Sequence, residues 1–559
     1  MRVIPARLWT AAILSAILQV LSFPIAGPVP IWRSTICWIA LTPLLYALTS
    51  RDSKGAPIGP KSAAMLGYVC GFIWYLGNCY WIYATMNIYG GLSKPVALGI
   101  LVLFCLYLGL YHALFATLIG AINRSRFGRN GALLLAPFAW VAVELARARI
   151  TGFPWDQLGI AQIDNPLLTR LAPLTGAYGL SFVIAAVNAA WLARFSVQER
   201  RHTKTILTVS GVVVVFLYIL FLRHLQTPNV ETSAGSAILL QENLGVGTPA
   251  ERTGPPLSVS QEIESFSALS LFPPRNEACR GIPELPSTRC GADPSQRPNL
   301  NADTRYLLHS DLIVWPEAPN DFFDQNSAYR HAMSQLARTA NAPIIVGDIG
   351  TDPDPQVARG YDLYNSADFI HADGTFAGRY DKMHLVPFGE YVPYKKLLFF
   401  AGNLLGAAGD FDRGKQRTVF TTGGHTYGTF ICYESVFADE VREYAKLGAE
   451  VLINISDDGW YGDTSAAWEH LNMVRMRAIE NHRWVLRATN TGVTAAIDPF
   501  GKVVTAAPRH VRTSLPVRFG YETDLTFYVK YGDLFAYLCA LVTIGGLAVA
   551  IYPSRTERA

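Results

Sequence analysis

Long apolar runs lie at the two ends of this 559-residue chain, and its middle has none. A helix needs about 20 mostly apolar residues to cross the roughly 30 Å hydrocarbon core of a bilayer. Runs of this kind lie at 8–26, 31–49, 63–86, 95–122, 131–147, 174–193, 205–223 and 534–552. The sequence therefore predicts a multi-pass α-helical membrane protein with eight transmembrane helices.

The composition agrees with this interpretation. Half of the residues are hydrophobic and only 16% are charged, which is outside the usual range of soluble globular proteins. The formal net charge of +4 is small for this length, so the sequence indicates neither a nucleic-acid partner nor an acidic one. Eight cysteines spread over such a chain do not form a disulfide scaffold.

Lysine and arginine in the short connections predict the orientation, because cytoplasmic loops are enriched in them. If all eight runs span, the residues on one side are Arg2, Arg7, Arg51, Lys54, Lys61, Arg124, Arg126, Arg129, Arg194, Arg200, Arg201, Lys204, Arg555 and Arg558. The opposite connections hold fewer, among them Arg33, Lys94 and Arg170. We therefore expect both termini in the cytoplasm and residues 228–530 outside it. Cleavage of 8–26 as a signal peptide is the alternative, but "LSFPIAGPVP" lacks a clean small-x-small cleavage site.

Residues 228–530 form a water-soluble domain between the helical region at 1–227 and a final helix and tail at 531–559. Strand-like runs rich in Ile, Val and Leu lie at 236–245, 311–318, 342–350, 427–435, 449–456 and 493–501. Helix-like spacing of apolar residues occurs between them, at 327–340 and 467–482. This alternation predicts a layered α/β domain.

Three polar side chains follow apolar runs in this domain. Glu317 comes after "DLIVWP", Lys382 lies in "GRYDKMHLVPFGEYVP", and Cys432 follows "GTFI". A free thiol is only a few per cent thiolate at neutral pH, so a nucleophilic cysteine needs a base or a cationic neighbour. A glutamate can take and return the proton, and an ammonium group can stabilise an oxyanion. Without further motifs, a cysteine at a strand end is more often a buried small hydrophobe.

The order "WPE", "GRYDKMHLVPFGEYVP", "CYES" resembles the Glu-Lys-Cys triad of the nitrilase superfamily. With "GFPW" at 152–155, "DDGWYGD" at 457–463 and the surrounding apolar runs, nearly the entire chain resembles the apolipoprotein N-acyltransferase family. The resemblance implies a nitrilase-like αββα sandwich in the periplasm, attached to the bacterial inner membrane.

The resemblance also implies a two-step acyl transfer. Cys432 would take a fatty acyl chain from a phospholipid, most simply phosphatidylethanolamine, and form a thioester. The amine of a diacylglyceryl-cysteine at the N-terminus of an apolipoprotein would then attack this thioester. Glu317 would be the general base and acid, and Lys382 would stabilise the oxyanion. No metal or organic cofactor is implied.

Five further residues are candidates around the triad. The amide N–H of Tyr433 is a candidate second oxyanion donor, and Glu390 and Glu434 match supporting carboxylates in the family. The two acids are otherwise plain salt-bridge or capping groups. Trp460 and Tyr461 are expected in a loop that faces substrate, or else in a core beneath a turn.

Other polar residues have open assignments. His384, His470 and His482 show no metal-ligand spacing, so structural roles are expected. Glu144 either pairs with Arg147 or lines a functional polar cavity, because charge inside a membrane is costly.

Two segments of the soluble domain carry separate expectations. Residues 264–303 are rich in Pro, Ser and Arg and are expected to be an insertion, in which Cys279 and Cys290 form a disulfide. The segment 391–411 has too few apolar residues to span a bilayer, and exposing them to water would be costly. We therefore expect it to be an interfacial arm that places Leu398 and Phe399 in the acyl layer of the membrane. Packing of this segment on its own domain is the alternative.

Two rival functions remain open on the sequence. A membrane-bound amidase of the nitrilase type would share the triad and use water in place of an amine. A non-catalytic binding or transport protein would have lost the chemistry, which the intact triad argues against.

Overall fold

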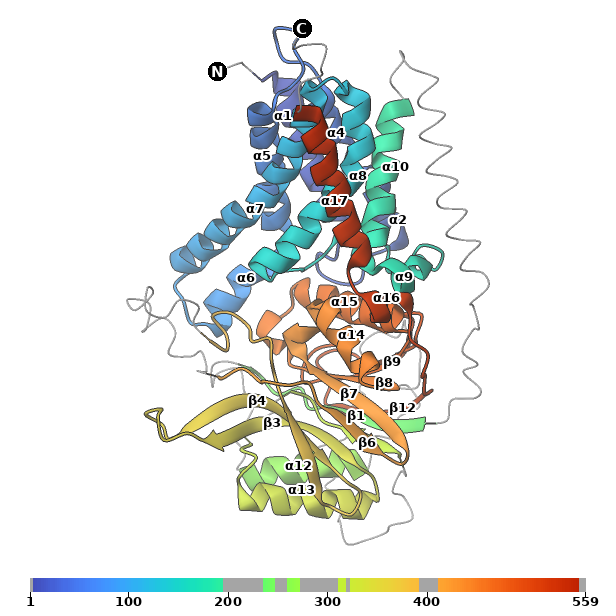
Figure 1. Ribbon diagram of the computed structural model, residues 1–559. Coiled ribbons are helices and arrows are strands. Elements are labelled where there is room, and N and C mark those ends of the chain that lie inside the picture. Colours follow the sequence, from blue (N-terminus) through green and yellow to red (C-terminus); the bar gives the residue numbers. More distant parts are fainter. Residues whose placement is uncertain are drawn as a thin grey trace.

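The computed structural model describes residues 4–194, 235–246, 259–271, 310–317, 322–391 and 411–551. A bundle of long helices stands on a sandwich of two β-sheets, and the last helix of the chain returns to the bundle (Figure 1). α1 begins and α17 ends at the end of the bundle that is remote from the sheets. The expected seventh run, 205–223, lies outside the described residues.

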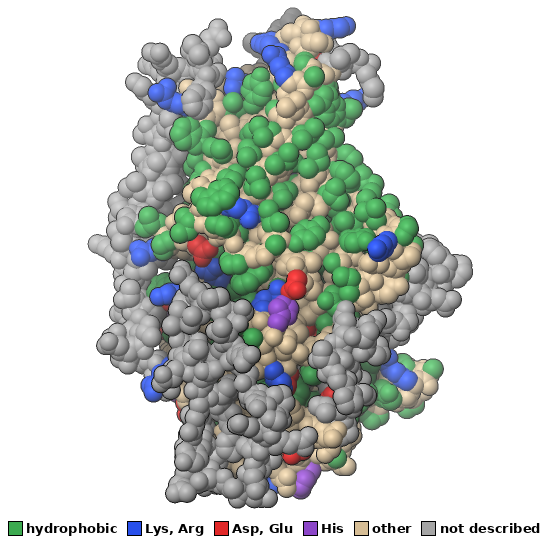
Figure 2. All heavy atoms as spheres, turned by 180° about the vertical axis from the view of Figure 1, so that it is seen from behind, with side chains coloured by type: hydrophobic (Ala, Val, Ile, Leu, Met, Phe, Trp, Pro, Cys, Tyr) green, Lys and Arg blue, Asp and Glu red, His purple; other side chains and the backbone are tan. Residues whose placement is uncertain are grey.

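The bundle comprises α1 (Ala6–Leu21), α2 (Ile31–Ser34), α3 (Cys37–Ala40), α4 (Thr42–Thr49), α5 (Pro60–Asn78), α6 (Trp81–Ala84), η1 (Thr85–Tyr89), α7 (Lys94–Arg124), α8 (Gly128–Ala146), η2 (Arg147–Thr151), η3 (Leu158–Gln162), η4 (Thr169–Leu171), α9 (Ala172–Thr175), α10 (Ala177–Arg194) and α17 (Leu534–Ile551). Within the described residues, five helical segments are long and apolar enough to cross a membrane: Ile31–Thr49, Lys94–Arg124, Gly128–Thr151, Ala177–Arg194 and Leu534–Ile551. Figure 2 shows a broad band of hydrophobic side chains on one face of the bundle, as expected for helices in contact with lipid.

The expected single run at 31–49 is interrupted, and the structure explains how. It divides into α2, α3 and α4, and Asn188 of α10 supplies the hydrogen bonds at the second break. The side-chain oxygen of Asn188 accepts from the N–H groups of Leu41 and Thr42 at 2.9 and 3.0 Å, and its amide donates to the Cys37 carbonyl at 2.9 Å. Broken helix is tolerated in a membrane only where freed backbone groups find such partners.

Small residues set the close packing of α5 on α7. A Cβ atom on Gly67 would lie 2.4 Å from the Cβ of Ala116, and one on Gly120 would lie 2.6 Å from the Cβ of Ala63. Both distances are shorter than any real contact, so only glycine permits this approach. Small residues at helix interfaces are the usual means of close packing in membranes.

The described residues of the soluble domain form two six-stranded sheets. One has the order β12-β1-β2-β3-β4-β5 and the other β11-β10-β9-β8-β7-β6. The strands are β1 (Gly235–Gln241), β2 (Leu312–Val314), β3 (Ile344–Pro353), β4 (Tyr361–Ile370), β5 (Phe376–Asp381), β6 (Val419–Thr422), β7 (His425–Ile431), β8 (Val451–Ser456), β9 (Trp484–Thr489), β10 (Ala495–Ile497), β11 (Val503–Ala506) and β12 (Thr513–Phe519). All six runs expected to be strands contain one, so the layered α/β prediction is confirmed.

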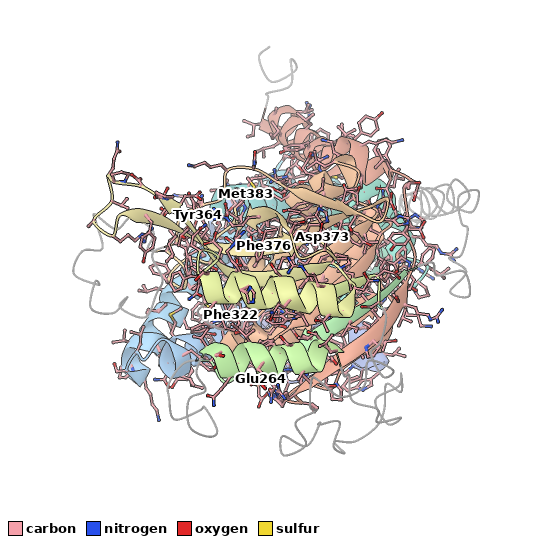
Figure 3. The ribbon with its side chains drawn as sticks, turned by 90° about the horizontal axis from the view of Figure 1, so that it is seen from below. Glu264, Phe322, Tyr364, Asp373, Phe376 and Met383 are labelled. Atoms are coloured by element: carbon pink, nitrogen blue, oxygen red, sulfur yellow. The ribbon has the colours of Figure 1, made fainter. Side chains whose placement is uncertain are left out.

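Helices cover the outer faces of both sheets. They are α12 (Val259–Leu271) and α13 (Ser327–Ala340) on the first sheet, and α14 (Ala438–Lys446) and α15 (Ala466–Asn481) on the second, followed by α16 (Phe527–Tyr531). Figure 3 shows α12 and α13 side by side across their sheet. Along β1, Ala237 and Leu239 face the inner core between the sheets, whereas Ile238 and Leu240 pack against the helices. Residues 264–271 of the expected insertion belong to α12, and 272–309 lie outside the described residues.

Helix α15 joins the two domains because it is buried on both sides. Leu471, Val474 and Ala478 belong to the core of the sandwich, whereas Met473 and Met476 pack with the membrane helices. Since both of these faces of α15 are buried, the sandwich is docked on the bundle rather than tethered to it.

Candidate active site

The three residues singled out in the sequence meet at the carboxyl ends of strands. Glu317 follows β2 and Lys382 follows β5, both in the first sheet, and Cys432 follows β7 in the second. All three side chains are buried, with Lys382 only 1% exposed. The site therefore spans the two sheets, and it forms only when the sheets are packed together.

Lys382 bridges two carboxylates. Its ammonium nitrogen is 2.9 Å from Oε1 of Glu317 and 2.9 Å from Oε1 of Glu390. The side-chain amide of Asn365, on β4, donates to the same two oxygens, at 2.7 Å for Glu317 and 2.6 Å for Glu390. The second oxygen of Glu317 accepts from the N–H of Asp457 at 2.8 Å. These contacts fix the Glu317 carboxylate on both of its oxygens.

The charges of this cluster stabilise one another. Burial alone would raise the pKa of Glu317, but the Lys382 ammonium and the hydrogen bonds hold this pKa below its usual value. Burial alone would lower the pKa of Lys382, but Glu317 and Glu390 hold it well above its usual value. Glu317 is therefore an ionised carboxylate, and Lys382 a cation, throughout the physiological range.

Cys432 is a neutral thiol at rest. Burial and the negative charge of Glu317 raise the pKa of its thiol well above the usual value, against the opposite effect of Lys382. The thiol lies close to the Glu317 carboxylate, and each group affects the pKa of the other. Its backbone φ is +49°, in the left-handed region, at the sharp turn from β7 into η10 (Cys432–Val436). A neutral thiol beside a carboxylate is the resting state of a nucleophile that is activated by a general base.

Glu434 connects the segments that carry the lysine and the cysteine. One carboxylate oxygen accepts from the Tyr380 hydroxyl at 2.7 Å and from the N–H groups of Met383 and His384 at 2.7 and 3.1 Å. The other oxygen accepts from the N–H of Ile431 at 2.8 Å. Glu434 thus sets the distance between the two segments without touching the thiol.

A buried ion pair contacts the backbone of Cys432 through a histidine. Asp458, in η11 (Asp458–Tyr461), pairs with Arg487 of β9 at 2.6 Å and with His470 of α15 at 2.8 Å. The other ring nitrogen of His470 donates to the Cys432 carbonyl at 3.0 Å. Burial alone would raise the pKa of Asp458, but Arg487 and His470 hold it below its usual value. The structural role expected for His470 is therefore confirmed.

The other two histidines considered in the sequence analysis also pair with acidic side chains of this chain. His384 lies 3.1 Å from Glu440, and His482 lies 2.8 Å from Asp524. His482, Glu522 and Asp524 bring their possible ligand atoms within 4.8 Å of one another, with Asp524 exposed. This group is at the surface and is not part of the triad.

The expected aromatic residues contact the membrane helices. The hydroxyl of Tyr433 donates to the Gly152 carbonyl at 3.0 Å, so "CYES" touches "GFPW" directly. Tyr461 is buried, with its ring 5.2 Å from that of Trp81. Trp460 is 43% exposed, and its carbonyl accepts from the Thr85 hydroxyl at 3.0 Å. The site therefore lies directly beneath the bundle.

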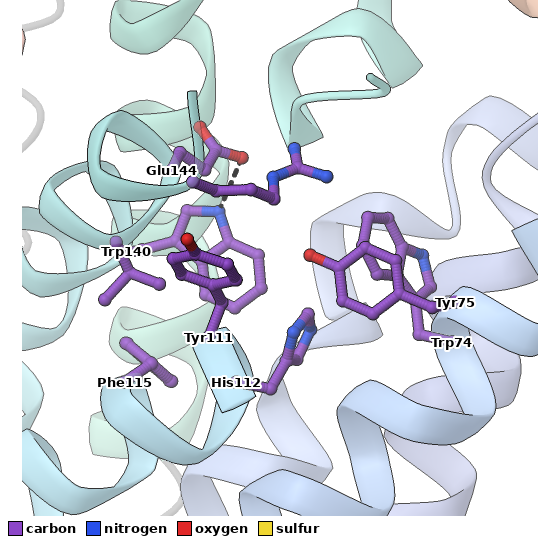
Figure 4. A pocket seen from close by; sticks show the side chains of 9 residues that line it. Trp74, Tyr75, Tyr111, His112, Phe115, Trp140 and Glu144 are labelled. Atoms are coloured by element: carbon purple, nitrogen blue, oxygen red, sulfur yellow. Dashed lines mark hydrogen bonds between the residues drawn. The ribbon is translucent and has the colours of Figure 1, made fainter. Parts of the chain in front are cut away.

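A small cavity inside the bundle lies close to this junction. Figure 4 shows aromatic side chains of α5, α7 and α8 around it, with Trp140 donating to Glu144 at 2.9 Å. Glu144 also accepts from the N–H of Leu158 at 2.8 Å, and Arg147 lies over the rings of Trp74 and Tyr75. Glu144 and Arg147 both line this cavity, and most of its other lining residues are aromatic.

Four of the residues expected from the sequence lie outside the described part of the chain, and one residue of the site was not expected. Leu398, Phe399, Cys279 and Cys290 lie outside the described residues. Sequence reasoning missed Asn365, which lies within an ordinary strand pattern, "YNSADF", and has no motif around it.

Comparison with known proteins gives the family. Residues 15–190 match the model of the apolipoprotein N-acyltransferase N-terminal domain, and 300–515 match that of carbon-nitrogen hydrolases. The chain is 33% identical to the apolipoprotein N-acyltransferase of Geobacter metallireducens, over 98% of this chain and 95% of the relative. It is 30% identical to that of Methylococcus capsulatus, over 88% of each. A nitrilase-superfamily amidase from Nesterenkonia aligns with a TM-score of 0.35 and 18% identity, over 55% of this chain and 96% of the amidase.

Proposed function

We propose that this chain, which belongs to the apolipoprotein N-acyltransferase family, moves a fatty acyl chain from a phospholipid to the N-terminal amine of a diacylglyceryl-cysteine. The observation that carries the proposal is the contact between the nucleophile's own turn and the membrane helices, made by Tyr433 and Gly152. A thiol in this position is within reach of an ester carbonyl at the surface of a bilayer.

The first step forms a thioester. Glu317 takes the proton of Cys432 as the sulfur attacks the ester carbonyl of the phospholipid. The oxyanion that develops is stabilised by the Lys382 ammonium and by the N–H of Tyr433. Collapse of this intermediate breaks the ester C–O bond, and Glu317 returns the proton to the departing oxygen, which releases a lysophospholipid.

The second step forms an amide. The amine of the diacylglyceryl-cysteine attacks the thioester carbonyl, and Glu317 accepts the proton that the nitrogen loses. The C–S bond breaks, and the sulfur regains a proton, so the enzyme returns to its resting thiol. This sequence is a ping-pong reaction, because the first product leaves before the second substrate reacts.

The orientation belongs to the same proposal. We place the sandwich in the periplasm of a bacterial cell, with eight spans in the inner membrane. Two features support this placement: the lysine and arginine distribution, and the position of the α1 start and the α17 end at the pole remote from the sheets (Figure 1).

The intact mass of the full-length protein in lipid nanodiscs tests the proposal. Incubation with phosphatidylethanolamine should add one acyl mass, and Cys432→Ala should abolish this addition. Cys539→Ala is the matched control, because Cys539 is a buried thiol on α17. Addition of a diacylated lipopeptide should return the protein to its original mass and yield the acylated peptide.

Two outcomes would reject the proposal. Acylation of Cys432→Ala would exclude the nucleophile. Release of free fatty acid at the same rate with and without lipopeptide would indicate water as the acceptor, and hence a hydrolase.

A further inference from the structure

Two buried carboxyl groups meet where the membrane helices contact the sandwich. Asp156 follows "GFPW" in the loop after η2, and Glu469 lies in the first turn of α15. They are 1% and 0% exposed. Neither group takes part in the acyl transfer derived above.

Each carboxyl group has one oxygen with a donor. Asn78 donates to Oδ2 of Asp156 at 2.8 Å, and the indole N–H of Trp155 donates to Oε2 of Glu469 at 2.7 Å. The other two oxygens, Oδ1 and Oε1, have no N–H or O–H donor within hydrogen-bond distance in the part of the chain that the structure describes. The two carboxyl groups lie close enough to interact with each other, and the Ser465 hydroxyl also interacts with Glu469. A single proton held between the two carboxyl groups would supply a donor for their orphaned oxygens.

The surroundings oppose ionisation of both groups at once. Burial raises the pKa of Asp156 to about 7, and burial together with Asp156 raises that of Glu469 well above its usual value. The charged and titratable groups that face the pair are Arg147 of η2 and Cys79 after α5. Arg147 favours the ionised form of Asp156.

The pair is connected to the nucleophile through two rings. Trp155, held by Glu469, stacks on His470 with 6.1 Å between ring centroids and 20° between planes. His470 donates to the carbonyl of Cys432. A change at Glu469 therefore reaches the backbone of the cysteine through Trp155 and His470.

We propose that Asp156 and Glu469 share one proton and act as positioning residues that fasten the membrane loop carrying Trp155 to helix α15, and thereby orient Cys432. When the shared proton is lost, two adjacent carboxylates repel each other, and the loop separates from α15. The kinetic part of this proposal rests on the proposed function, whereas the shared proton itself does not.

Infrared spectroscopy of the full-length protein tests the shared proton without any catalysis. A protonated buried carboxyl group gives a C=O stretching band that shifts in deuterated water. Glu469→Gln should remove one such band, because its amide donates to Asp156 and its oxygen accepts from Trp155 as the protonated glutamate does. The control is Asp348→Asn, which alters a second buried carboxyl pair, Asp348 and Asp368, in the sandwich. It should remove a different band.

The pH dependence of acyl transfer tests the positioning role. The ratio of the Glu469→Gln rate to the native rate cancels the titration of the triad, which both proteins share. The ratio should rise by about tenfold per pH unit above the apparent pKa of the pair, because only the native protein loses the shared proton. Asp156→Asn, whose amide donates to Glu469, should give the same rise, and Asp348→Asn should give a flat ratio.

The results separate this proposal from the proposed function. An unchanged carboxyl band in Glu469→Gln would overturn the shared proton even if acyl transfer is normal. A band that disappears while the rate ratio stays flat would overturn the positioning role. Absence of acyl transfer in the native protein would refute the proposed function and leave the infrared result valid.

Discussion

Replacement of Asn365 by alanine should raise the pKa of Glu317, the proposed general base, without touching the nucleophile. The Asn365 amide donates to both Glu317 and Glu390, and it is one of the groups that hold the pKa of Glu317 below its usual value. In Asn365→Ala, two carboxylates keep a single shared partner, the Lys382 ammonium.

The expected shift in the pKa of Glu317 follows from the loss of one hydrogen bond. A hydrogen bond to a charged group contributes about 1.5–3 kcal/mol, and one pKa unit corresponds to about 1.4 kcal/mol. Loss of the bond from Asn365 should therefore raise the apparent pKa of the coupled Glu317 cluster by about 1–2 units. Glu317 acts as a base only when it is ionised, so the acid limb of the rate profile should move to higher pH by the same amount.

The assay is the rate of thioester formation on Cys432 as a function of pH, measured by intact mass in nanodiscs. The matched control is Ser366→Ala, the next residue on β4. Its hydroxyl donates to the side chain of Asp381, the residue before Lys382, at 2.6 Å, and not to a triad side chain. This control should keep the native acid limb. If the Asn365→Ala profile coincides with that of the native protein, Asn365 does not tune the base.

Three further outcomes are expected. Lys382→Ala should slow thioester formation by about 10²- to 10³-fold, as expected for loss of one oxyanion donor; a native rate would remove Lys382 from that role. Asp458→Asn should lower the unfolding free energy by about 3–5 kcal/mol, because it leaves Arg487 buried without its carboxylate. Since the pKa of Asp458 is depressed on folding, this contribution is present at neutral pH and lost as the pH falls through the folded-state pKa, and a denaturant series at several pH values checks it. Leu398→Asp should reduce turnover of long-chain phospholipid and spare alkylation of Cys432 by a small thiol reagent, and equal loss of both activities would reject an interfacial arm.

The sequence was sufficient where a local rule is strict. A bilayer fixes the length of an apolar helix, so four of the expected runs coincide with α7, α8, α10 and α17 to within a few residues. The expected runs 8–26 and 63–86 extend five and eight residues beyond the ends of α1 and α5. Helices α13 and α15 were also predicted within one residue, because their apolar spacing is regular. The break in 31–49 could not be predicted, since the partner that allows it, Asn188, is on a distant helix.

The sequence determined on its own that this chain has membrane helices around an α/β domain, and that a glutamate, a lysine and a cysteine end its strands. It did so because apolar length and strand ends are properties of consecutive residues. Tertiary structure alone decided the partners: Asn365 meets Glu317 from 48 residues away, and Trp155 meets Glu469 from 314 residues away. Hydrogen bonds of this kind depend on how two sheets and a helical bundle pack together, and no local pattern records that packing.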